Sequence, residues 1–215
     1  MEGIIYKILD YKESSSLVYL FTPQGLDSVL VRGAKKYKTR ALAFCEEISC
    51  VSYNKTSSTL GSLIDYEIIN RFSNIKKSFT KLKYASIILE VARQSVDERK
   101  ARIYNFTKLM LEKIDSGYDA KSITFIYLVK MLKVFGILPS LEEDIIHINY
   151  FKEVDKLEFS RVFKEAYYTK DYNLKVSFIN LLNLISYYNK LDAISTYNIN
   201  KMLEVNDGTK EKATP

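Results

Sequence analysis

The chain has 215 residues, of which 47% are hydrophobic and 27% charged, and its formal net charge is +6. These values are typical of an ordinary soluble globular protein that forms one large domain or two small ones. No apolar run approaches the roughly 18 residues needed to span a bilayer, and the first residues are unlike a signal peptide, so we expect a cytoplasmic protein.

Five short strand-like segments occupy about the first seventy residues, which favours a small closed barrel of the OB type over an open sheet with exposed edges. The expected strands cover residues 3–10, 17–22, 26–32, 44–54 and 60–69. Pro23, Gln24 and Gly25 supply a tight turn between the second and third strands, because proline fixes φ and glycine accepts a positive φ.

Cys45 and Cys50, in the expected fourth strand, are the only cysteines of the chain. They lie too far apart for a Cys-x-x-Cys pair, and no further cysteine could complete a zinc set. A disulfide is disfavoured in a reducing compartment. We therefore expect two free, half-buried thiols that act as small hydrophobic side chains.

The connection after the third strand carries the clearest functional signal. Between Ser28 and Phe44 the chain has five cations and no acidic residue. They are Arg32, Lys35, Lys36, Lys38 and Arg40, with Gly33, Ala34 and Tyr37 among them. Phosphate backbones are common cellular polyanions, and neutralising them releases counterions, which drives binding. A solvated connection whose lysines only keep the protein soluble is the alternative interpretation.

Two features of this connection favour nucleic acid over simple solvation. Gly33 and Ala34 allow the backbone to approach a ligand closely, and Tyr37 offers a ring on which an unpaired base could stack. The loops and one sheet face of an OB-type barrel are also where single strands usually lie. Among the strand aromatics we expect most to pack the barrel and one or two to join a base-stacking surface. These aromatics are Tyr6, Tyr19, Phe21, Tyr53 and Tyr66.

Beyond Arg71 the hydrophobic period becomes helical. The first expected helix has apolar positions at Ile75, Phe79, Leu82, Ala85, Ile88, Leu89 and Ala92, with Ser73 or Asn74 as its N-cap. Further helices are expected over 102–114, closed by Ser116 and Gly117, and over 119–135, ended by Gly136. Helical segments at 157–168, 174–188 and 196–203 follow, and 206–215 is typical of a polar tail.

The fold class is therefore α+β, with an N-terminal five-stranded OB-type β-barrel followed by an α-helical domain. We expect the barrel domain over residues 1–72, the helical domain over 73–205 and a flexible tail over 206–215. No linker rich in glycine, proline or serine separates barrel and helices, so the two parts are expected to pack together.

A second basic set follows the barrel in a stretch, residues 68–89, that has no acidic residue. It consists of Arg71, Lys76, Lys77, Lys81 and Lys83. The spacing spreads these charges over the outer face of an amphipathic helix, where they could simply be solvated. If they share one side with the basic connection, they extend a track for DNA.

The chain offers no credible active site. The single histidine, His147, has no second histidine or cysteine cluster nearby in sequence and no nucleophile motif such as G-x-S-x-G. The acidic run from Glu142 to Asp144 is typical of the first turn of a helix. No P-loop or G-x-G-x-x-G motif is present, so nucleotide use is not indicated. We expect no enzyme, no cofactor and no bound metal.

Several segments resemble the bacterial recombination mediator family RecO. The similar segments are residues 8–14, 19–23 with Gly25 and Leu26, 32–40, 60–72, 83–90 and 135–139. The Arg-Gly-Ala-Lys-Lys-Tyr-Lys-Thr-Arg run at 32–40 looks like the family's Lys-Gly-Ala-Arg-Arg-x-Lys-Ser-Arg. Many members continue with a four-cysteine zinc module, whereas residues 140–150 contain no cysteine here.

The resemblance implies a protein that binds single- and double-stranded DNA and anneals complementary strands. It further implies that the protein helps to load recombinase onto strands coated by single-strand-binding protein. The implied partners are RecR and the acidic C-terminal tail of the single-strand-binding protein, and the implied location is the nucleoid.

Our leading hypothesis is a DNA-binding recombination mediator. Lys35, Lys36, Lys38 and Arg40 would contact phosphates, Arg32 would support them and Tyr37 would stack. Lys76 and Lys77 would extend the site. The runner-up is a protein–protein adaptor that docks acidic partner tails without contacting DNA, and a hydrolase would need a cluster of catalytic residues that the sequence does not show.

Overall fold

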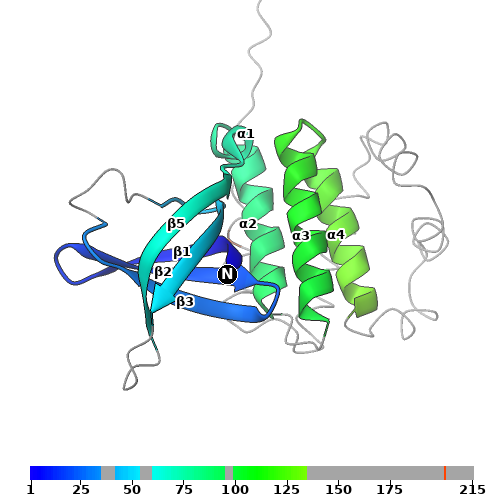
Figure 1. Ribbon diagram of the computed structural model, residues 1–215. Coiled ribbons are helices and arrows are strands. Elements are labelled where there is room, and N and C mark those ends of the chain that lie inside the picture. The colour runs from blue at the N-terminus through cyan, green and yellow to red at the C-terminus, as the bar shows by residue number, and fades with distance from the viewer. Residues whose placement is uncertain (35–41, 54–59, 95–98, 135–200, 202–215) are drawn as a thin grey trace, which may run out of the picture. The chain divides into compact units, whose positions relative to one another are not determined.

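The computed structural model describes residues 1–34, 42–53, 60–94, 99–134 and 201 (Figure 1). It divides into two compact units, Met1–Tyr127 and Leu128–Pro215. The first unit contains the strands and the first three helices. Within the described parts of the chain, no helix is both long enough and apolar enough to cross a membrane.

The five strands form a closed barrel in the order β1-β2-β3-β5-β4, which confirms the expected OB-type fold (Figure 1). The strands are β1 (Glu2–Tyr11), β2 (Ser15–Thr22), β3 (Gly25–Val31), β4 (Glu47–Tyr53) and β5 (Gly61–Asn70). All neighbours are antiparallel except β3 and β5, which run parallel and close the barrel at Val29 and Gly61. Closure satisfies the strand edges that an open sheet would expose.

Alternating side chains fill the barrel, as the period-two pattern predicts. Its core cluster consists of Ile5, Val18, Leu20, Val29, Val31, Ile48 and Cys50. Both cysteines are free and buried. The expectation that Cys45 lies in a strand is wrong: it precedes β4 in a left-handed conformation, with φ 59°. Burial raises the pKa of the Cys45 thiol to about 12, so this thiol stays protonated and inert.

Three connections between the strands and helices lie at the same end of the barrel. Because β1 and β3 are both antiparallel to β2, they end where β2 begins. Because β5 is parallel to β3 and antiparallel to β4, the end of β5 and the start of β4 lie at that same end. The β1–β2 turn, the connection after β3 and the exit of β5 into the helices therefore share one end of the barrel.

The first expected helix is broken into α1 (Ser73–Lys76) and α2 (Phe79–Gln94). The Ser78 N–H donates to the Ile75 carbonyl, which closes α1 as a tight turn, and the Ser78 hydroxyl then accepts a bond from the Lys81 N–H at 3.4 Å. The break shifts the helical phase. Ile75 is buried as expected, whereas Phe79, expected on the apolar face, is 63% exposed.

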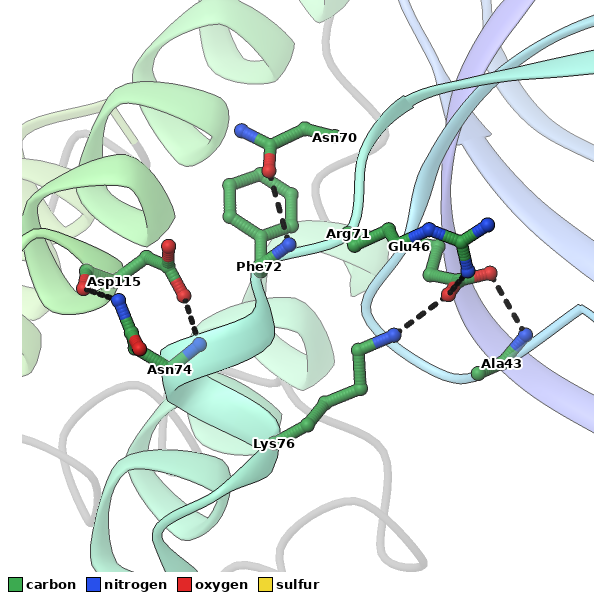
Figure 2. A network of polar contacts seen from close by, with 8 residues as sticks. All are labelled: Ala43, Glu46, Asn70, Arg71, Phe72, Asn74, Lys76 and Asp115. Carbon is green, nitrogen blue, oxygen red and sulfur yellow. Dashed lines mark hydrogen bonds and ion pairs between the residues drawn. The ribbon is translucent and has the colours of Figure 1, made fainter.

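The start of α1 is stabilised from a distance, so the expected local cap at Ser73 or Asn74 is wrong. The N-cap position is Phe72, which has φ 44° and no capping side chain. The Asp115 carboxylate, at the end of α3 (Lys100–Asp115), instead accepts a bond from the Asn74 N–H at 2.8 Å (Figure 2). It also accepts one from the Ile75 N–H at 3.0 Å. A carboxylate from another helix thus satisfies donors that a free helix start leaves unpaired.

The remaining helices agree with the sequence where the structure describes them. Helix α3 is closed by Ser116, its C-cap, and by Gly117, which has φ 107°, as predicted. Helices α2 and α3 lie side by side (Figure 1), and α4 covers Ala120–Val134. Gly136, Pro139 and the later expected helices fall outside the described residues, apart from Lys201, which is helical.

A buried carboxylate joins the barrel to α3. Glu47, the first residue of β4, is fully buried, and its Oε1 accepts a bond from the Tyr104 hydroxyl at 3.0 Å and from the Lys108 ammonium at 2.6 Å. Burial and the nearby Glu47 charge raise the pKa of the Tyr104 phenol, so it remains a donor. A buried carboxylate is tolerated only when such partners replace water. These contacts hold α3 against the barrel.

Removing the Tyr104 hydroxyl tests this junction. We expect Tyr104→Phe to lower the free energy of unfolding by about 1.5–3 kcal/mol, because a hydrogen bond to a buried charge is lost. Tyr127→Phe is the matched control. It breaks a buried bond of 3.1 Å to the neutral Thr107 hydroxyl and should cost only about 0.5–1.5 kcal/mol. Urea unfolding measures both, and an equal or smaller loss for Tyr104→Phe would contradict this role of Glu47.

Substituting Asp115 tests the cap supplied from α3. Asp115→Ala should destabilise the protein by about 0.5–2 kcal/mol, the usual cost of a lost helix cap. Amide hydrogen exchange should become faster at Asn74, whose N–H loses its acceptor, and to a smaller extent at Ile75, whose N–H keeps a bond of 3.1 Å to the Phe72 carbonyl. Asp119→Ala, which removes the acceptor of the Ser122 N–H in the first turn of α4, is the control and should leave those two amides unchanged. Unchanged exchange in the Asp115 variant would refute the cap.

Candidate nucleic-acid interface

The basic connection starts and ends on the barrel core. Arg32 is exposed directly after β3, and Gly33 takes φ 70°, a conformation that favours glycine. Ala34 and Leu42, on either side of residues 35–41, both pack against the core cluster of the barrel. The candidate contacts Lys35, Lys36, Tyr37, Lys38 and Arg40 lie outside the described residues.

The returning end of this connection is held by a second buried carboxylate, Glu46. Its side chain is 2% exposed, and its Oε2 accepts a bond from the Ala43 N–H at 3.0 Å. The other oxygen, Oε1, pairs with the Lys76 ammonium at 2.7 Å and the Arg71 guanidinium at 3.5 Å. Figure 2 shows that these groups come from the connection before β4, the end of β5 and α1.

Glu46 therefore links the end of the basic connection to two cations of the second set, Arg71 and Lys76. Ala43 is three residues from Arg40, and Lys76 belongs to the second set. That the two sets share one side of the molecule stays a prediction, because Lys35, Lys36, Lys38 and Arg40 lie outside the described residues. Two cations on one carboxylate leave a net positive charge there, and that charge adjoins the segment with the candidate phosphate contacts.

The cations of the second set differ in the solvent exposure of their side chains and in the contacts that they already make. The Lys76 side chain is 27% exposed and its ammonium already faces Glu46. Arg71 keeps 63% of its side chain in solvent despite its contact with the same carboxylate. Lys77, the residue after α1, is exposed. Lys83 is buried, with its ammonium 5.1 Å from the centre of the Tyr84 ring.

Sequence reasoning missed Glu46 and gave no contact role to Arg71. A signal for Glu46 was present, because the pair Glu46–Glu47 ends the acid-free run of the basic connection. An acidic residue next to an uncompensated basic segment is a candidate counter-ion.

The described strand aromatics are all buried or half-buried. Phe21 is buried, with its ring 5.8 Å from that of Tyr104, and Tyr66 packs against the barrel core. Tyr19 is half-buried, 6.0 Å from the Tyr6 ring, and the Lys7 ammonium lies 5.7 Å from its centre. A base-stacking role for one or two of these aromatics stays a prediction, and the side chain of Tyr53 is not among those described.

The described residues contain no group of three or more histidine, cysteine or acidic side chains placed to hold a metal ion. His147 and the acidic run 142–144 lie outside the described part of the chain. What the described site offers is positive charge, which suits an anionic polymer.

Comparison with known proteins agrees with this chemistry. The family model for the N-terminal part of recombination protein O matches residues 1–72, and the model for its C-terminal part matches residues 76–201. A Listeria welshimeri protein named DNA repair protein RecO is 33% identical over 146 residues, which cover 66% of this chain and 57% of that protein.

Other relatives of the same name give similar values. The Bacillus pumilus protein is 34% identical over 146 residues, and the Lactobacillus acidophilus protein is 31% identical over 151 residues. This chain matches 57% and 60% of their respective lengths, less than two thirds in each case. The two family models together account for the barrel and for the helical part, and the chain therefore belongs to the recombination protein O family.

Proposed function

We propose that this chain is a DNA-binding recombination mediator without catalytic turnover. One observation carries the proposal: the Glu46 network joins the basic connection after β3 to Arg71 and Lys76 at one end of the barrel (Figure 2). Family membership supports a role in DNA repair, because the similar proteins are named DNA repair proteins. A positive site of this kind attracts a phosphate backbone and binds it by releasing counterions.

In the proposed complex the basic connection supplies most of the phosphate contacts. Lys35, Lys36, Lys38 and Arg40 pair with phosphates, Arg32 supports them from the end of β3, and Tyr37 stacks on a base. Lys77 and Arg71 extend the contact toward α2, and Lys76 contributes more weakly because Glu46 already neutralises part of its charge.

The proposed cellular role follows the family. The protein would act on nucleoid DNA, bind single and double strands, anneal complementary strands and help to load recombinase onto strands coated by single-strand-binding protein. RecR and the acidic tail of the single-strand-binding protein are the proposed partners.

Charge reversal in the basic connection tests the DNA contact. The double variant Lys35→Glu/Arg40→Glu should bind an oligothymidylate of about 20 nucleotides more weakly than the wild type. The slope of log K against log salt should flatten by at least about 1.4, because each lost phosphate contact removes about 0.7. Fluorescence anisotropy across a salt series measures both quantities.

The matched control for this test is Arg102→Glu/Lys121→Glu, which makes the same charge change on α3 and α4. It should leave the salt slope close to that of the wild type. An unchanged slope in the Lys35/Arg40 variant would refute the assignment. Tighter binding of the wild type to an acidic peptide than to the oligonucleotide would favour the adaptor hypothesis instead.

Neutralising Glu46 tests whether it acts as the internal counter-ion of the site. In Glu46→Gln the amide oxygen can still accept from the Ala43 N–H, but Lys76 and Arg71 lose their negative partner. We expect several-fold tighter DNA binding and a salt slope steeper by about 0.7, the value of one further phosphate contact. Glu112→Gln, with the same change in net charge on α3, is the control, and thermal unfolding verifies that both variants are folded. Equal slopes for the two variants would contradict the counter-ion role.

A further inference from the structure

Phe79 is the most exposed large apolar side chain in the described part of the chain, at 63%. It is the first residue of α2 and owes this position to the break after α1, which turns it away from the apolar face. A single exposed hydrophobic residue is ordinary on a protein surface. What distinguishes Phe79 is the set of groups around it.

Cations precede and follow Phe79 closely along the chain. Lys77 and Lys76 lie two and three residues before it, so their Cα atoms are within about 8 and 11 Å of its own. Lys76 shares Glu46 with Arg71, whose side chain is 63% exposed. Lys81 follows two residues later. Phe79 is therefore an exposed ring that is close in sequence to several cations.

The two carboxylates that contact α1 already have partners. Glu46 is 2% exposed and bonds to Ala43, Lys76 and Arg71. Asp115 accepts from the Asn74 and Ile75 N–H groups. Within residues 68–89 the sequence has no other acid to oppose the cations. The surface around Phe79 thus selects a partner that is both anionic and aromatic.

A single nucleic-acid strand has both properties. Its phosphates match the cations, and its unpaired bases present flat faces on which an aromatic side chain stacks without regard to sequence. In a duplex the base faces are already stacked on one another, so an exposed ring has little to gain. We propose that Phe79 stacks on an unpaired base of single-stranded DNA whose flanking phosphates contact Lys77 and Arg71. This inference rests on the proposed DNA-binding function and extends its site to α2.

The substitution Phe79→Leu tests the stacking while keeping an apolar side chain. Loss of one base–aromatic stack weakens single-strand binding by roughly fivefold or more. The salt slope should stay that of the wild type, because no charge is removed, and duplex affinity should not change. A purely structural role would instead lower single-strand and duplex affinity together, or lower the melting temperature.

A tryptophan reporter provides a second, independent readout. The chain has no tryptophan, so Phe79→Trp introduces a unique fluorophore at the proposed stacking position. Its emission should be strongly quenched by oligothymidylate and much less by a duplex of equal length. Leu26→Trp is the matched control, because Leu26 is 52% exposed and follows the turn at the opposite end of the barrel. Its emission should change little.

The outcomes separate this inference from the proposed function. If the wild type shows no salt-dependent DNA binding, the proposed function and the stacking site both fail. If DNA binding responds to Lys35→Glu/Arg40→Glu but Phe79→Leu retains full single-strand affinity, only the stacking site is overturned. Quenching of Phe79→Trp by an acidic peptide but not by oligothymidylate would also overturn it.

Discussion

Two adjacent carboxylates at the start of β4, Glu46 and Glu47, join the barrel to α1 and α3 within the unit Met1–Tyr127. Glu46 faces the end of β5 and α1, and Glu47 faces α3. Both are almost entirely buried, at 2% and 0% exposure. Buried carboxylates are costly unless donors replace the lost water, and leaving one unpaired is strongly destabilising. The lysines, the arginine and the tyrosine that meet this pair are therefore held in place, and the helices with them.

The same pair shapes the candidate interface. Glu46 fixes the end of the basic connection through the Ala43 N–H and collects Lys76 and Arg71 on its other oxygen. A buried counter-ion of this kind keeps cations ordered and close together, which a solvated surface cannot do at the same net charge. Glu46 also neutralises part of the charge of these cations, so an arriving phosphate competes with it for them. The described part of the site therefore consists of a buried carboxylate, Glu46, and the cations that it holds, Arg71 and Lys76.

Sequence patterns predicted the barrel and the main helices because those depend on local periodicity. Half-buried and buried residues alternate along β2 from Ser15 to Leu20, as a strand requires, and Gly117 follows the end of α3 where a glycine was expected. The break between α1 and α2 was missed, because the apolar spacing from Ile75 to Ala92 runs through it without interruption. Phe79 was misassigned for the same reason.

Contacts between residues distant in sequence could not be predicted in the same way. Asp115 caps α1 across a separation of 41 residues, and Tyr104 meets Glu47 across 57. The residues next to Asp115 or Tyr104 in the sequence give no indication of the distant residue that each one contacts. The basic connection was recognisable from its charge, but its link to Lys76 through Glu46 depends on how β4, β5 and α1 meet in three dimensions.

Hydrogen exchange with and without single-stranded DNA tests the central claim, that one surface is formed by the basic connection and the segment entering α2. The account predicts slower amide exchange on addition of oligothymidylate over residues 32–44 and 71–79, with no change at the β2–β3 turn, residues 22–26. Protection confined to other parts of the chain, or no protection at saturating oligonucleotide, would contradict it.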